Sequence, residues 1–209
     1  MSLMRKLFKI TWIIIFLIIN ENLKAQQHIE NEIISSVVTS ECKASDPDTI
    51  FTRKGRIKKI RCFQISDIVL VKETQTSIES HSNDSIVIHY LKQDLPDFDT
   101  EIYYDFKERN LHPFIVDSIK GFKAKVYYAS KAEINTLLNG GNGWTSFYRK
   151  YHDSPLIEVS RPGINKMGNK ALIYFSRGHG PLSGIGVYLL LELENNIWTI
   201  KGWSLSWIS

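Results

Sequence analysis

Hydrophobic and polar residues alternate near the end of the chain, between residues 184 and 208. Four aliphatic residues share one face of a strand by its two-residue period: Val187, Leu189, Leu191 and Leu193. Asn195-Asn196 tolerates positive φ and suits a two-residue hairpin turn. Three of the five tryptophans follow in this stretch: Trp198, Trp203 and Trp207. We therefore predict two long strands that form a wall of the core.

The segment before this hairpin predicts more strands and three short helices. Residues 156–160 and 170–176 are strand-like and are separated by turn residues, which favours an antiparallel meander. Apolar residues recur every four positions in residues 97–110, and helical patterns also cover 131–138 and 144–151. The 131–138 helix begins with a capping box, Ser130 to Glu133. These elements predict an α+β fold: a curved antiparallel C-terminal β-meander with short helices on one face.

The N-terminal part of the chain gives weaker signals. Residues 26–45 start with a helical apolar stripe, and residues 50–72 suggest one or two strands, of which 65–71 is the clearest. Residues 85–91 read as a further strand. We expect these strands to extend the C-terminal sheet, so that residues 26–209 form a single domain.

Residues 1–25 have the three-part layout of a secretory signal peptide. A basic start with Arg5, Lys6 and Lys9 leads into the apolar run 10–19, and a polar stretch ends at Ala25. An uncleaved anchor or a buried helix is the alternative. The sequence thus predicts a Sec-exported protein, periplasmic or secreted, with no membrane span after removal of the signal.

The charge of the chain does not favour a polyanionic partner. Residues 1–25 hold four of the 26 basic and one of the 22 acidic residues, so the remaining 22 and 21 nearly cancel. One basic surface is concentrated in the sequence: Arg53, Lys54, Arg56, Lys58, Lys59 and Arg61. It lacks interleaved aromatic residues, so we predict no nucleic-acid partner and interpret it as a solvated edge strand, with a polyanion-binding surface as the alternative.

Cys42 and Cys62 are the two cysteines of the chain. In an oxidising compartment they allow one disulfide, and two buried thiols are the alternative.

Catalytic and metal-binding motifs are poorly represented. No HExxH, GxSxG or zinc spacing occurs, so we predict no metal and no cofactor. The loop 177–183 is the preferred site, because glycines on both sides of His179 let backbone approach a ligand. An exposed hairpin tip is the alternative. The candidate ligand-binding residues are His179, Arg177, Trp144, Tyr148 and Tyr188.

Several different short motifs occur along the second half of the chain. They are Asp105-Phe106 with Asn110, Gly143-Trp144 with Phe147-Tyr148 and Tyr151, Ser160-Arg161 with Gly163 and Asn165, Ala171-Leu172, Gly184-x-Gly186 and Trp207-Ile208-Ser209. In these motifs, residues 105–209 resemble an uncharacterised family of exported bacterial proteins. The resemblance implies export and a shared fold, and no activity.

Three functions remain open from the sequence. The first is a non-catalytic module of the cell envelope that binds an unknown small ligand or an envelope protein. The second is a hydrolase-type enzyme that uses His179 as a weak candidate base. The third is a structural or assembly role, which predicts an exposed apolar patch of a size that suits a partner.

Overall fold

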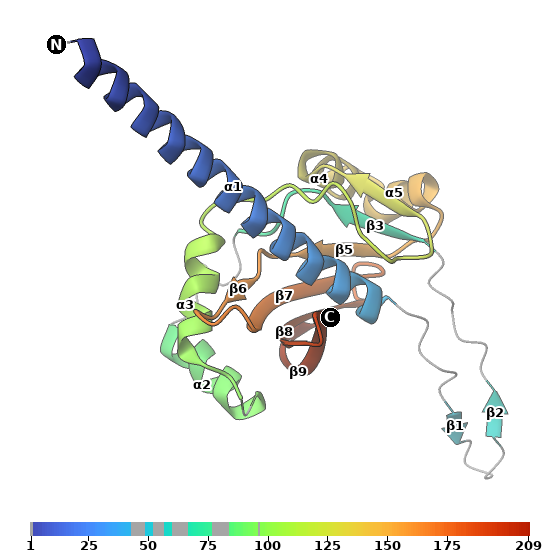
Figure 1. Cartoon of the computed structure of the whole chain (residues 1–209). Helices are drawn as coiled ribbons and strands as arrows, with labels where there is room; N and C mark the ends of the chain where they lie inside the picture. The colour runs from blue at the N-terminus through green and yellow to red at the C-terminus, as the bar shows by residue number, and fades with distance from the viewer. Residues whose placement is uncertain (1, 43–48, 52–56, 60–66, 77–83, 96) are drawn as a thin grey trace.

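The computed structural model describes residues 2–42, 49–51, 57–59, 67–76, 84–95 and 97–209. A seven-stranded mixed sheet forms the centre of the molecule, in the order β4-β3-β5-β7-β8-β9 with β6 beside β7 (Figure 1). Its strands are β3 (Ile68–Val71), β4 (Val126–Ala129), β5 (Leu156–Val159), β6 (Gly163–Ile164), β7 (Lys170–Gly178), β8 (Gly184–Glu194) and β9 (Ile197–Ile208).

The predicted antiparallel meander is confirmed. β5, β7, β8 and β9 pair antiparallel in sequence. Asn195 and Asn196 both have positive φ, 49° and 62°, as the two-residue turn requires. Leu189 and Leu191 are buried, whereas Trp203 and Trp207 are exposed because β9 is the last strand of the sheet.

An N-terminal strand does extend the sheet, but it lies inside it. β3 pairs in parallel with β4 on one side and with β5 on the other. All four residues of β3 are buried. A continuous apolar run with both faces covered is typical of such an interior parallel strand.

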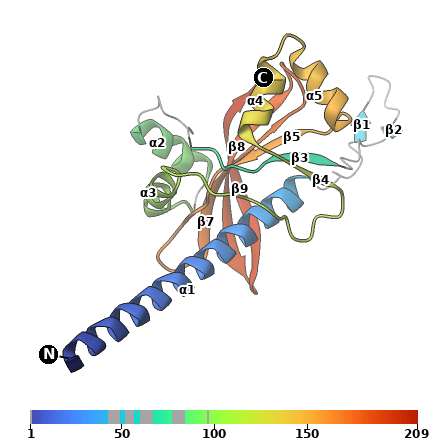
Figure 2. The same ribbon diagram turned by 90° about the horizontal axis from the view of Figure 1, so that it is seen from above.

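Four short helices cover one face of the sheet (Figure 2). They are α2 (Asp84–Asp94), α3 (Thr100–Arg109), α4 (Lys131–Asn139) and α5 (Gly143–Tyr151). Apolar residues of α2 and α3 pack on β7 and β8, and those of α4 and α5 pack on β3 and β5. Ser130 caps α4 by accepting a hydrogen bond from the Glu133 N–H at 3.2 Å. The predicted α+β fold with short helices on one face is therefore correct.

The strand predicted at residues 85–91 is wrong, because this segment is the helix α2. Val87 and Leu91 are buried four residues apart, while Ile86 and Tyr90 on the other side are exposed. A short apolar run fits either period, and contact with the sheet selects the helix here.

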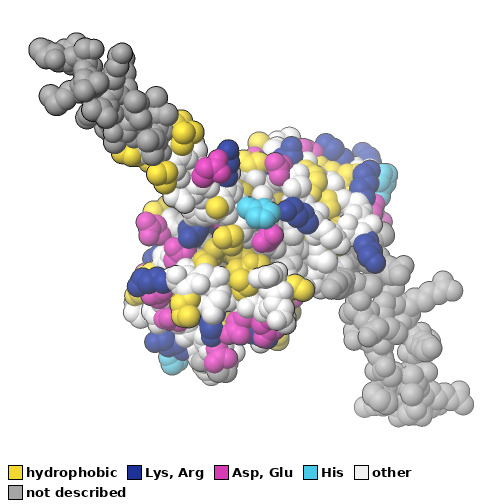
Figure 3. Space-filling view, in the orientation of Figure 1, with side chains coloured by type: hydrophobic (Ala, Val, Ile, Leu, Met, Phe, Trp, Pro, Cys, Tyr) yellow, Lys and Arg dark blue, Asp and Glu magenta, His cyan; other side chains and the backbone are white. Residues whose placement is uncertain are grey.

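The opposite face of the sheet is covered by α1 (Ser2–Glu41), a single long helix. Its first buried residue among those with described side chains is Glu30, and the apolar stripe Ile33, Ile34, Val37 and Val38 enters the core. Residues 15–19 are exposed on the part of α1 that projects from the domain (Figure 3). Within the described ranges, no helix is both long and apolar enough to cross a membrane.

A separate two-stranded sheet pairs β1 (Thr49–Phe51) with β2 (Ile57–Lys59). β2 contains Lys58 and Lys59 of the basic surface. Arg53, Lys54, Arg56 and Arg61 lie outside the described residues.

Candidate functional site

The structure brings three of the predicted site residues together at the loop between β7 and β8. The Tyr148 hydroxyl of α5 donates a hydrogen bond to the backbone carbonyl of His179. The Trp144 indole lies 3.2 Å from the position that a Cβ on Gly178 would occupy, so a larger residue there would push the indole by a few tenths of an ångström. The His179 N–H donates to the Ser183 carbonyl at 2.6 Å and closes the loop. This cluster fixes the loop to helix α5.

The other two candidates lie elsewhere. Arg177 follows Ile173 and Phe175 at two-residue spacing, on the face that α1 covers. Its positive charge opposes the effect of burial on the pKa of both Glu41 and Cys42, at the end of α1. Tyr188 is buried between the sheet and α3, where its ring contacts Phe106 at 5.9 Å between ring centroids. It is a core residue.

The chemistry available to His179 is limited. Partial burial, and then the nearby Arg177 charge, lower the pKa of His179, so its imidazole is neutral at neutral pH. A general base also needs an orienting group and a nucleophile within hydrogen-bonding distance. Among the described residues, no carboxylate or hydroxyl is hydrogen-bonded to this ring.

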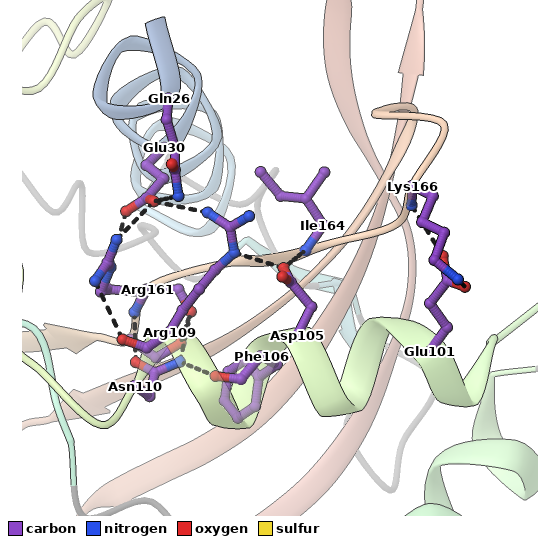
Figure 4. Close-up of polar contacts among 11 residues, drawn as sticks. Gln26, Glu30, Glu101, Asp105, Phe106, Arg109, Asn110, Arg161, Ile164 and Lys166 are labelled. Carbon is purple, nitrogen blue, oxygen red and sulfur yellow. Dashed lines mark hydrogen bonds and ion pairs between the residues drawn. The ribbon is translucent and has the colours of Figure 1, made fainter. Parts of the chain in front are cut away.

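A different set of polar residues forms the densest network in the described structure, and its centre is Glu30 of α1 (Figure 4). Its fully buried carboxylate pairs with two guanidinium groups, those of Arg109 and Arg161, at 2.9 Å each. Arg109 also pairs with Asp105, whose carboxylate accepts a hydrogen bond from the Ile164 N–H at 2.7 Å. Two carboxylates and two guanidinium groups are thus neutralised together.

Asn110 completes this network by joining α3 to the segment after β5. Its side chain donates to the carbonyls of Phe106 and Arg161 and accepts from the Arg161 N–H, at 2.8–2.9 Å. The network therefore connects α1, α3 and the β5–β6 connection. Every charge in this network has a partner, and the Glu30 carboxylate is fully buried. We therefore interpret the network as structural and not as a catalytic centre, and we call it the charged junction.

The sequence reasoning missed this junction, although a signal for Glu30 exists. Glu30 precedes Ile33 and Ile34 by three and four residues, so it lies on the same side of the helix as the apolar stripe. A carboxylate on a buried face requires a cationic partner. The identity of that partner depends on the tertiary fold.

A groove of about 540 Å³ runs between α1 and the start of β9. Hydroxyl groups of Ser35, Ser36 and Thr39 line one side, and Trp198 and Ile200 line the other. The Ser36 hydroxyl donates to the Trp198 carbonyl at 2.6 Å. A surface that combines hydroxyls with an aromatic ring suits a polar chain such as a peptide or a glycan.

Apolar side chains continue along β9 beyond this groove. Trp203 is 61% exposed, Leu205 47% and Ile208 72%. Single exposed apolar residues are ordinary, but a row along a sheet edge indicates an interaction surface. We call the segment from Ile200 to Ile208, with these side chains, the β9 edge.

Cys42 is a free, buried thiol at the end of α1, and Cys62 lies outside the described residues, so the predicted bridge stays a prediction. Within the described residues, no group of three or more histidine, cysteine or acidic side chains is arranged to hold a metal ion.

Comparison of the chain with protein-family models, with curated proteins and with solved structures found no match. Several of the motif residues in the second half of the chain have structural roles in this fold. A Cβ on Gly163 would lie 2.5 Å from the Ile102 carbonyl and from Phe106 of α3, and one on Gly186 would collide with the Trp207 ring. Asp105, Asn110 and Arg161 belong to the charged junction.

Proposed function

We propose that this chain is exported and acts as a non-catalytic interaction module of the cell envelope, with the β9 edge as its binding surface. The row of exposed apolar side chains on an edge strand carries the proposal. Such strands pair with further strands through backbone hydrogen bonds, and side-chain contacts then provide specificity.

The distribution of contacts along α1 supports export. Residues 15–25 are partly or fully exposed, and the packed part of the helix begins at Glu30. Removal of residues 1–25 leaves the charged junction and the apolar stripe intact. In an oxidising compartment a Cys42–Cys62 bridge belongs to the same proposal.

Two measurements test the proposal. Cell fractionation with intact-mass analysis is expected to find the protein outside the cytoplasm with an N-terminus at Gln26. Envelope extract passed over the immobilised protein is expected to leave a bound component, and Leu205→Lys abolishes its retention. The matched control is Ile197→Lys, which changes another exposed apolar residue of β9 outside the β9 edge. A cytoplasmic full-length protein, or equal retention by both variants, would refute the proposal.

A hydrolase at the 177–183 loop is the second candidate, favoured by the neutral imidazole of His179 and its fixed loop. It requires a turnover that is lost in His179→Ala while the unfolding midpoint stays unchanged. Turnover that survives this substitution would exclude His179 as the base.

A further inference from the structure

β9 is the last strand of the described sheet, and no described strand pairs with its outer side. Its register is fixed at one end by the Asn195-Asn196 turn and at the other by hydrogen bonds exchanged between Gly184 and Ser209, at 3.0 and 3.3 Å. In an antiparallel pair, alternate residues turn their N–H and C=O groups away from the neighbouring strand. On β9 these residues are Trp198, Ile200, Trp203, Leu205 and Ile208, and the Trp198 carbonyl already accepts a hydrogen bond from Ser36 of α1.

Two irregularities interrupt β9, and their positions restrict what can pair with it. The register shifts at Lys201 and again at Ser206, each of which adds one residue to β9 without a partner on β8. The backbone N–H and C=O groups of a regular strand would lose their alignment with the outward groups of β9 at each bulge. Many proteins protect a sheet edge in this way. A generic extended peptide is therefore a poor fit.

The backbone groups of a second copy of β9 stay aligned with those of the first. The outward residues Ile200, Trp203, Leu205 and Ile208 are separated by three, two and three positions, so their pattern is symmetric about Ser204. An antiparallel copy related by a two-fold axis at Ser204 has its bulges opposite those of the first strand. From Ile200 to Ile208, every outward backbone group then faces another outward group.

We infer that the partner of the β9 edge is a second copy of this chain, paired antiparallel about Ser204 to form one continuous sheet across a two-fold dimer. This inference rests on the proposed function and names the partner of the same surface. The symmetry is the closed, isologous kind that most homodimers have.

The side chains agree with this register. Trp203 lies opposite Leu205 of the second copy, and Ile200 lies opposite Ile208, so that four apolar cross-strand pairs form. Lys201 is the one charged residue of β9, and it lies opposite Trp207 of the second copy, so no like charges oppose each other within the paired strands.

The surface available is sufficient for a weak dimer. Ile86 and Tyr90 of α2 are also exposed and line a groove with residues 204–206, on the face of the sheet opposite the one that carries the Trp203 and Leu205 side chains. With Trp203, Leu205 and Ile208 they offer on the order of 500 Å² per copy, or ~1,000 Å² in total. That area lies at the low end for specific interfaces, so we expect a Kd of about 1–100 μM.

Analytical ultracentrifugation of the full chain, across a concentration series, tests the dimer. The wild type is expected to change from monomer to dimer, and Leu205→Lys is expected to raise Kd about 100-fold because a two-fold interface repeats the change twice. Ile197→Lys is the matched control and should leave Kd within a factor of three. Circular dichroism verifies that both variants fold. A wild type that stays monomeric at 500 μM, or association unaffected by Leu205→Lys, would overturn the inference.

Disulfide trapping tests the register. In a chain with Cys42→Ala and Cys62→Ser, the variants Trp203→Cys and Leu205→Cys are mixed and oxidised. The opposite positions lie about 5.5 Å apart between Cα atoms, within disulfide range, whereas two copies of either variant alone place their cysteines about 7–8 Å apart. The mixture is expected to cross-link at least tenfold faster than either variant alone. Equal rates would refute the pairing about Ser204.

The two proposals fail separately. A monomer that still retains an envelope component through Leu205 overturns the dimer and leaves the proposed function. A dimer with the expected cross-link in a protein that stays in the cytoplasm overturns the proposed function and leaves the dimer.

Discussion

Replacement of the buried carboxylate in Glu30→Gln is expected to destabilise the fold more than any other single charge removal on α1. The glutamine keeps the shape of the side chain but leaves Arg109 and Arg161 without their shared anion. Breaking a buried ion pair from one side costs about 3–5 kcal/mol. The two arginine side chains are 19% and 20% exposed, so water reaches part of each guanidinium group, and Arg109 keeps Asp105. We therefore expect a loss of about 3 kcal/mol in the free energy of unfolding.

Urea unfolding followed by far-ultraviolet circular dichroism measures this loss, with the slope of the transition compared between variants. The matched control is Glu32→Gln on the same helix. The Glu32 side chain is 46% exposed and pairs with His28, so its removal should cost less than about 0.5 kcal/mol. If Glu30→Gln also stays within about 0.5 kcal/mol of the wild type, the junction does not stabilise the packing of α1 and our interpretation of it is wrong.

Three further predictions concern other parts of the fold. Gly163→Ala should lower the free energy of unfolding, measured in urea, by about 2–3 kcal/mol, because its Cβ would collide with the α3 backbone. Gly141→Ala, where the Cβ meets open space, is the control and should leave the free energy of unfolding nearly unchanged. Equal effects of the two substitutions would contradict this packing. Burial raises the pKa of Glu158, so its ionised form costs stability above the unfolded pKa and not below it. Glu158→Gln, whose side chain still accepts a hydrogen bond from Gln75, should therefore raise the free energy of unfolding at pH 8, and this increase should shrink toward pH 4. A difference in the free energy of unfolding that is constant across this range would refute the assignment. Burial raises the pKa of the Cys42 thiol to about 12, so iodoacetamide at pH 8 should leave Cys42 unmodified until urea unfolds the chain. Modification that also requires added reductant would indicate the bridge to Cys62. Rapid labelling of Cys42 in the folded protein would contradict its burial.

Local patterns in the sequence determined the elements with long, consistent periods. The alternation in β8 and β9, the Asn195-Asn196 turn and the Ser130 cap of α4 depend on residues close together in the chain, so each could be predicted before any tertiary contact was known. The helices predicted over 97–110, 131–138 and 144–151 were located for the same reason, because their helical spacing and capping residues lie within the segments themselves.

Only the tertiary structure decided which of two periods a short apolar run follows, and which distant charges meet. Residues 85–91 fit a strand or a helix, and their packing on the face of β7 and β8 opposite α1 selected the helix α2. Glu30 is 79 residues from Arg109 and 131 from Arg161, so no local rule could pair them. The predicted loop site at His179 formed in part, because α5 brings Trp144 and Tyr148 to it.

The hydrophobic pattern marks apolar side chains and does not say whether a neighbour covers them. Trp198 and Trp203 belong to the same face of the same strand, and both were expected in the core. α1 covers the first, while the second lies beyond the helix at the sheet edge and is left in water. The sequence thus supplied an apolar strand, and α1, which covers only the start of that strand, left the rest of it as a surface.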